Sequence, residues 1–138
     1  GLFRSAPTSI ILSTEVSFLQ FVRFEDVPVR PATRMRLSFW YIIGQGNAGE
    51  CRARVVEYCD RPNGYFRQLG PLDHELSGKD VPQGQWLLFE HEWETERDTN
   101  TLAVDFRLLG MNVVGGFWVD DWKLEYVGRD HELNKPHR

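Results

Sequence analysis

The most constraining feature of this sequence is the repeated alternation of apolar and polar residues in short runs. A period of two is typical of β-strands with one buried face, because successive side chains point to opposite sides. Clusters of Gly, Pro, Asn and Asp separate the runs, and no segment shows a long apolar stripe at helical spacing with a cap and a stop. The expected strands lie near Ser9–Ser13, Val16–Phe24, Met35–Ile43, Cys51–Tyr58, Trp86–Glu94, Leu102–Leu109 and Phe117–Val127.

Seven short strands with frequent turns predict an all-β protein in which two antiparallel sheets pack face to face. The length of 138 residues fits one such domain, which we expect over residues 1–127, followed by a polar tail over 128–138. Turns are expected at 26–31, 44–49, 61–64, 78–84, 96–100 and 110–116.

Alternation also assigns the two faces of three strands. The apolar sets predict a core from Met35, Leu37, Phe39, Tyr41 and Ile43, from Cys51, Ala53 and Val55, and from Leu102, Val104, Phe106 and Leu108. The opposite sets contain Arg36, Ser38, Trp40 and Ile42, then Arg52, Arg54, Val56 and Tyr58, then Ala103, Asp105 and Arg107. We expect these opposite sets to leave one face rich in arginine and aromatic side chains.

Charge and hydropathy exclude several classes of partner. The formal charge of −4 comes from 20 acidic and 16 basic residues without a basic block, which argues against nucleic-acid binding. No run of about 18 apolar residues is present, so no membrane span is expected. The first residues show no basic segment followed by an apolar core, so no secretory signal is visible.

The two cysteines, Cys51 and Cys59, fall in one expected strand. Eight steps of about 3.3 Å would separate their Cα atoms by roughly 26 Å, whereas a disulfide needs about 4.4–6.8 Å. Unless the segment bends sharply, we expect two separate thiols.

A Gly44-x-Gly46-x-x-Gly49 motif follows an expected strand, as in a dinucleotide-binding turn. That function requires the turn to open a helix that leads to a second parallel strand. Residues 50–59 are short, carry adjacent valines and lead into another turn, so the motif is interpreted as a hairpin loop, with cofactor binding as the alternative.

Catalytic motifs are weak. No Gly-x-Ser-x-Gly motif occurs. Glu90, Glu92 and Glu94 could supply the pair of carboxylates that a glycosidase needs, but alternating acids on a strand are more typical of a solvated face. His91 shares the face of Phe89 and Trp93, which indicates a buried, hydrogen-bonded histidine rather than a ligand.

Three stretches carry a family resemblance. Val27-Pro-Val-Arg-Pro-Ala-Thr-Arg-Met-Arg-Leu-Ser-Phe-Trp-Tyr41, Gly84-Gln-Trp86 with Phe89 and Trp93, and Gly116-Phe-Trp-Val-Asp-Asp-Trp-Lys-Leu124 follow one another in the chain. In that order they resemble the jelly-roll carbohydrate-binding modules appended to xylanases, glucanases and related bacterial enzymes. MAM adhesion domains are more distantly similar but usually carry disulfides.

The resemblance implies an all-β, antiparallel, two-sheet jelly-roll sandwich that binds a polysaccharide or oligosaccharide on its concave sheet or at its loop-bearing end. Sugar rings pack their C–H faces on aromatic rings, and fixed polar side chains bind the hydroxyls. The predicted stacking residues are Trp40, Tyr58 and Trp118, and the predicted hydrogen-bonding residues are Arg52, Arg54, Asp105 and Arg107. Alternatively, the arginines and the aspartate only pair with one another.

The same resemblance implies a structural calcium ion with Asp120 as a ligand, although the usual N-terminal partner motif is not recognisable here. It also implies a covalently linked catalytic domain and an extracellular or periplasmic location. The leading hypothesis is a non-catalytic carbohydrate-binding module. The alternatives are a structural or protein-interaction sandwich without a glycan site, and a free-standing glycosidase.

Overall fold

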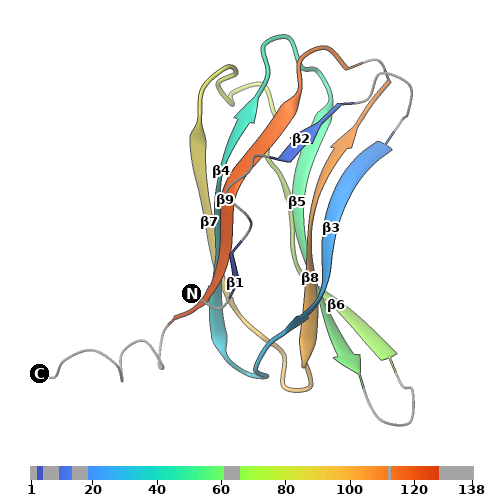
Figure 1. Ribbon diagram of the computed structural model, residues 1–138, viewed down its shortest axis with the longest axis vertical. Helices are drawn as coiled ribbons and strands as arrows, with labels where there is room; N and C mark the ends of the chain where they lie inside the picture. Colours follow the sequence, from blue (N-terminus) through green and yellow to red (C-terminus); the bar gives the residue numbers. More distant parts are fainter. Residues whose placement is uncertain (1–2, 5–9, 14–18, 61–65, 112, 128–138) are drawn as a thin grey trace, which may run out of the picture.

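The computed structural model describes residues 3–4, 10–13, 19–60, 66–111 and 113–127, which form nine β-strands and no helix (Figure 1). The all-β prediction is confirmed. The strands are β1 (Phe3–Arg4), β2 (Ile10–Leu12), β3 (Leu19–Pro28), β4 (Arg34–Ile43), β5 (Glu50–Asp60), β6 (Phe66–Glu75), β7 (Leu87–Glu94), β8 (Thr101–Leu109) and β9 (Phe117–Tyr126).

The strands form two antiparallel sheets that lie face to face (Figure 1). Sheet A has the order β1-β9-β4-β7, and β2 also pairs with β9. Sheet B has the order β3-β8-β5-β6. Because β1 and β2 pair with different parts of β9, they share one strand position beside it. If β1 and β2 are counted together as the first strand, the strand order in both sheets is that of a jelly roll. The predicted architecture is therefore confirmed.

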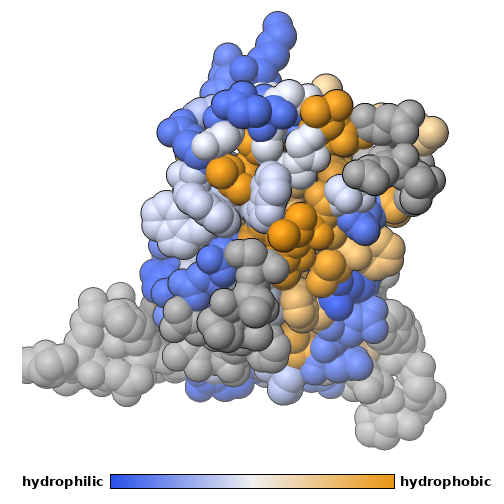
Figure 2. Space-filling view, turned by 45° about the horizontal axis from the view of Figure 1, so that its top comes forward, coloured by the Kyte–Doolittle hydropathy of each residue, from blue (hydrophilic) through white to orange (hydrophobic). Residues whose placement is uncertain are grey.

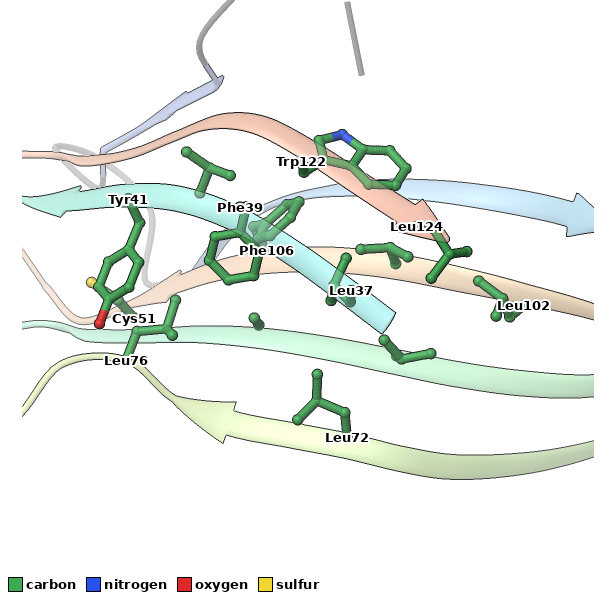
Figure 3. Close-up of a cluster of buried hydrophobic side chains, with 14 of the residues drawn as sticks. Leu37, Phe39, Tyr41, Cys51, Leu72, Leu76, Leu102, Phe106, Trp122 and Leu124 are labelled. Atoms are coloured by element: carbon green, nitrogen blue, oxygen red, sulfur yellow. The ribbon is translucent and has the colours of Figure 1, made fainter. Parts of the chain in front are cut away.

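The core lies between the sheets and follows the predicted alternation. Alternate side chains of β4, from Met35 to Ile43, are buried, and so are the predicted inward sets of β5 and β8. Figure 3 shows labelled side chains from both sheets meeting in this space. The Phe39 and Phe106 rings meet edge to face with their centroids 5.0 Å apart, and they join the two sheets at the centre of the core.

The 44–49 segment is not a hairpin loop, which corrects the prediction. It leaves β4 in sheet A and enters β5 in sheet B, so it crosses from one sheet to the other. The residues after it form a strand and not a helix, which removes the structural basis for dinucleotide binding. The crossing brings Gly44 against residues 115–116, where the Gly44 N–H donates to the Gly116 carbonyl at 2.8 Å.

Strand β6 was not predicted. Its sequence contains Gly70 and Pro71, which interrupt the alternation and resemble a turn signal. In the fold, β6 forms an edge of sheet B, where a missing N–H is tolerated. The register with β5 shifts between Val55 and Glu57, so β6 accommodates one extra residue there. An edge position and a bulge leave little trace in hydrophobic periodicity.

The boundaries of β3 also differ from the prediction. The strand continues past Phe24 to Pro28, through a register shift in which Asp26 adopts a positive φ of 57°. Asp26 was predicted to begin a turn. In the structure it forms a β-bulge, after which pairing with β8 resumes. The expected first residues of this strand, 16–18, lie outside the described residues.

A buried acid closes one end of the core. The Glu57 side chain is inaccessible and accepts hydrogen bonds from the Trp93 indole N–H at 2.8 Å and the Glu96 backbone N–H at 2.9 Å. The Thr99 hydroxyl donates to the same carboxylate. These bonds tie β5 to the end of β7 and to the turn that follows it.

Both cysteines are buried and are not joined in a disulfide, as the spacing predicted. In the described part of the chain, no helix is long and apolar enough to cross a membrane. The predicted tail over 128–138 lies outside the described residues, so the domain boundary stays a prediction.

Candidate functional site

The predicted sugar-binding residues do not share one surface. Trp40 and Trp118 lie on β4 and β9 of sheet A, whereas the other five candidates lie on β5 and β8 of sheet B. Both groups point outward, so they occupy opposite sides of the sandwich. The prediction of a single face is wrong, because alternation separates inward from outward residues but does not say which sheet a strand joins. The sheet B group is Arg52, Arg54, Tyr58, Asp105 and Arg107.

The outer face of sheet B carries two neighbouring rows of polar and aromatic residues that run across all four strands. Both rows follow directly from the strand register. In the order β3, β8, β5, β6, the first row is Phe21, Arg107, Arg52 and Glu75, and the second row is Arg23, Asp105, Arg54 and Asp73.

Asp105 is the centre of this arrangement and is only 1% exposed. Its carboxylate accepts from Arg107 through Nε at 3.1 Å and Nη2 at 3.4 Å. The Arg54 Nε lies 3.3 Å away and the Arg23 Nη1 lies 3.8 Å away. Three guanidinium groups, each roughly one fifth exposed, therefore share one buried carboxylate.

Asp105 is thus not the exposed hydrogen-bonding residue that was predicted. It holds the arginines, and this part of the face agrees with the alternative in which these residues pair with one another. Because ion pairing fixes the planes of the guanidinium groups, the remaining N–H donors of Arg54 and Arg107 are presented in a restricted geometry. Such a fixed array of donors suits vicinal hydroxyls or carboxylates.

Aromatic rings lie beside the arginines. Phe21 is 48% exposed on β3, and the Arg107 guanidinium lies 5.2 Å from its ring centroid. The partly buried Tyr58 accepts a hydrogen bond from Arg23, whose guanidinium lies 5.9 Å from the Tyr58 ring centroid. The sequence interpretation missed Phe21 and Arg23, although the alternation that assigned faces elsewhere would also have placed them outward on β3.

Arg52 belongs to a separate acidic group at the β6 edge. Its Nε lies 2.8 Å from Asp73, and its Nη1 contacts Glu50 and, at 3.8 Å, Glu75. The hydrogen bond with Asp73 is the largest influence on the Arg52 pKa, and together with Glu50 it raises that pKa despite some burial. Arg52 is therefore committed to its neighbours more completely than Arg54.

The outer face of sheet A holds the other candidates. Trp40 is 43% exposed and pairs in register with Leu88 on β7 and Asp120 on β9. The half-buried Trp118 lies against the backbone, since a Cβ added to Gly44 or Gly116 would approach its ring to 3.0 Å. Trp40 is therefore the more accessible of the two predicted stacking residues on sheet A.

Apolar exposure on sheet A extends beyond the two predicted tryptophans. Ile11 on β2 pairs with Trp118 and is exposed, as are Leu88 and Trp86 at the β7 side. Figure 2 shows hydrophobic side chains along the middle of one side of the molecule, between hydrophilic side chains. Trp86 was assigned to a strand in the sequence interpretation but not to a surface.

The calcium prediction concerns Asp120 on β9. Asp120 and Asp121 are adjacent at a bulge in β9, where Asp121 has a positive φ of 52°. Within the described ranges, no three His, Cys, Asp or Glu side chains gather as a metal site. Asp120 as a calcium ligand therefore stays a prediction, because calcium prefers six to eight oxygen ligands.

The loop-bearing end of the sandwich contains a cleft of about 630 Å³ between the 44–49 loop and residues 75–83. Gln83 shapes it by accepting from the Gly46 N–H at 2.9 Å and donating to the Asn47 carbonyl at 2.7 Å. Its lining is mainly polar and includes Glu75, Ser77 and Lys79 but no aromatic ring. The cleft itself therefore offers no aromatic surface for stacking.

The acidic side chains of β7 lie on a solvent-exposed face, as their alternation along the strand predicted. Glu90, Glu92 and Glu94 are exposed, and Glu92 pairs with Arg34 at 3.2 Å and Arg36 at 3.7 Å. His91 stacks with Trp93, and burial lowers its pKa, with His74 and Arg34 acting in the same direction. Its Nε2 is buried without a hydrogen-bond partner among the described residues, so the expected fully bonded histidine is wrong.

No protein-family model matches the sequence, and no curated protein matches it. Several solved structures match the fold. A structure described as Family 16 Carbohydrate Binding Module-2 superposes with a TM-score of 0.59 at 15% identity, covering 85% of this chain and 75% of that chain. The C-terminal family 22 carbohydrate binding module of Clostridium thermocellum Xyn10B gives a TM-score of 0.50 at 14% identity, covering 91% and 84%.

The enzymatically active domain of bacteriophage CBA120 tailspike protein 4 gives a TM-score of 0.61 at 15% identity. The match covers 89% of this chain but only 17% of the tailspike chain, so the likeness concerns one part of a larger protein. Identities this low demonstrate a common fold alone. This chain has the jelly-roll β-sandwich fold of carbohydrate-binding modules.

Proposed function

We propose that this domain is a non-catalytic carbohydrate-binding module that holds a polysaccharide chain against the outer face of sheet B. The observation that carries the proposal is the set of three guanidinium groups fixed around the buried Asp105 at the centre of an open sheet. These groups offer N–H donors in fixed planes, and the exposed Phe21 supplies an apolar surface beside them. Donors and a ring side by side are what a pyranose requires.

The register of sheet B supports the same proposal, because it places Phe21 beside Arg107 on β8 and Arg54 on the next strand, β5. An extended glycan could lie across β3, β8 and β5 and contact Phe21, Arg107 and Arg54 in turn. Tyr58 lies beyond them on the same face and would extend the contact along β5.

We further propose that the domain is linked to a catalytic domain that acts on the same polymer, in an extracellular or periplasmic setting. The fold is also found beside catalytic modules, as in a Clostridium thermocellum xylanase structure that joins a family 22 module to a GH10 module and contains xylohexaose. The domain itself would not hydrolyse the polymer. Release of reducing sugar from xylan, β-glucan or polygalacturonate would contradict that assignment.

A structural or protein-interaction role is the second candidate, and the mutual pairing of the arginines with Asp105 favours it. The two roles differ in a direct experiment, native affinity electrophoresis in gels that contain xylan, β-glucan or polygalacturonate. Under the proposed function, at least one polymer retards the protein, and Phe21→Ala or Arg54→Gln weakens retardation about tenfold, or about 1.4 kcal/mol.

Matched controls are available on other surfaces. Met111→Ala removes an exposed apolar side chain at the loop end, and Arg34→Gln removes an ion-paired arginine from sheet A. Neither control should change retardation. If no polymer retards the wild-type protein, the structural role replaces the proposed function.

A further inference from the structure

A hollow of about 200 Å³ lies on the outer face of sheet A, on the opposite side of the sandwich from the proposed sugar-binding face. Strand β4 forms its floor, and β7 and β9 form its walls. The residues that matter for its chemistry are Ser38, Trp40, Leu88, Glu90, Asp121 and Lys123.

One side of the hollow is an apolar platform. Trp40 is the exposed aromatic ring at the rim, and the exposed Leu88 lies beside it in register on β7. An exposed indole next to a small hollow presents a flat surface to a ring-shaped ligand while the hollow receives the ligand's substituents. The C–H face of a pyranose is such a ring.

The floor contains an unused polar group. Ser38 is only 4% exposed, and its hydroxyl has no hydrogen-bond partner within the described residues. In register, Ser38 lies between Glu90 on β7 and Lys123 on β9. A buried hydroxyl without a partner is costly in a folded protein, and a ligand hydroxyl that reached it would supply the missing bond.

The charges around the hollow indicate a neutral ligand. Arg36 is paired with Glu125 at 3.5 Å and with Glu92 at 3.7 Å, so it is not free to hold an anion. Glu90 and Asp121 then add two carboxylates to the lining, and Lys123 adds one ammonium group. This surplus of negative charge disfavours a carboxylate or a phosphate, whereas the hydroxyls of a neutral sugar can donate to the carboxylates and accept from Lys123.

The backbone forms this site at a special position. The register between β4 and β9 shifts from Ser38 to Trp40, and Asp121 takes a left-handed conformation opposite them. The bulge lets Asp121 line the hollow while Trp122 stays in the core. Bulges commonly re-aim side chains in this way beside binding sites.

We infer that this hollow is a second sugar-binding site, in which one neutral pyranose unit stacks on Trp40 and bonds to Ser38. The inference rests on the proposed function, since both sites would take glycans. It adds that the two sites face opposite directions, so that one domain can hold two separate chains.

The test is isothermal titration calorimetry with xylohexaose, cellohexaose and hexagalacturonate, on the wild type and on single variants. A neutral hexasaccharide should bind at two sites per molecule. Trp40→Ala should remove one site and leave the sheet B site, whereas Phe21→Ala should do the reverse. Met111→Ala should retain both sites.

Ser38→Ala separates binding from folding. Loss of an unbonded buried hydroxyl should leave the melting temperature unchanged or higher, whereas the affinity at the sheet A site should fall about tenfold. The indole N–H signal of Trp40 should shift on titration in the wild type and in Phe21→Ala.

The remaining outcomes distinguish failure of the sheet A site from failure of the sheet B site. One site per molecule, insensitive to Trp40→Ala and Ser38→Ala, would overturn the second site and leave the proposed function intact. Binding that is lost in Trp40→Ala but unaffected by Phe21→Ala and Arg54→Gln would overturn the sheet B site and keep the sheet A site. Absence of binding by all three hexasaccharides would overturn both proposals.

Discussion

At the scale of single residues, Glu57 carries more of the stability than its polar character suggests. Three donors converge on its buried carboxylate, from Trp93, Glu96 and Thr99. In Glu57→Gln, the amide NH₂ would face at least one of these donors, and the charge-assisted bonds would be lost. We expect the free energy of unfolding to fall by about 2 kcal/mol, measured by urea denaturation. Glu94→Gln, on the exposed side of β7, should change it by less than about 0.5 kcal/mol.

Cys51 is expected to be chemically silent in the folded protein. Burial raises the pKa of its thiol to about 12, opposed in part by a hydrogen bond with Ser77. Because the thiolate is the reactive form, Cys51 should not react with a thiol reagent such as DTNB at pH 8 until the protein unfolds. Both thiols should react within seconds in concentrated guanidinium chloride.

The same pKa has a consequence for stability. A thiol that holds its proton more tightly when folded contributes stability that is fully present below its unfolded pKa near 9 and is lost as the pH rises toward about 12. Cys51→Ala should flatten this decline in urea titrations between pH 9 and 11. Equal slopes in the variant and the wild type would contradict the assignment.

At the scale of elements, the crossing from β4 to β5 is the most tightly packed connection. A Cβ at Gly44 would lie 2.6 Å from the Gly116 backbone nitrogen, which cannot move without breaking the start of β9. Gly44→Ala should therefore lower the free energy of unfolding by about 2 kcal/mol or more, as expected for overpacking.

Gly70 in β6 provides the matched control. A Cβ there would meet no atom within 4 Å. Gly70→Ala should leave stability unchanged or raise it by about 0.5 kcal/mol, because the alanine restricts the unfolded chain. Similar losses in the two variants, compared by thermal unfolding, would mean that packing around Gly44 is not the cause.

Hydrophobic alternation predicted some strands of this fold and missed others. Strands with one buried face, such as β4 and β8, were found because their alternation is uninterrupted. The edge strand β6 was missed because Gly70 and Pro71 interrupt the alternation of apolar and polar residues. An edge strand tolerates both residues, since one side of its backbone has no partner strand. In the candidate site, Arg54 and Trp40 were both correctly assigned to outer faces. Their separation onto opposite sheets depends on long-range pairing, which no local pattern encodes.

At the scale of the whole molecule, the topology determines how the chain must fold. In the described strands, β5 and β6 form the one hydrogen-bonded pair that is consecutive in sequence, and the other pairs join strands distant along the chain. Closing long loops before contacts form is entropically costly, so we expect refolding on a scale of milliseconds to seconds. Stopped-flow tryptophan fluorescence would measure it. Complete refolding within about 100 microseconds would contradict this reading of the topology.

The acidic side chains of β7 have an effect beyond the site. Strand β7 is an outer strand of sheet A, so its far side presents unpaired backbone groups that another molecule could extend. If two such strands approached one another antiparallel, Glu90, Glu92 and Glu94 of each copy would be drawn close to the same carboxylates of the other. Mutual repulsion makes that association unfavourable, which keeps neighbouring copies apart at high protein concentration.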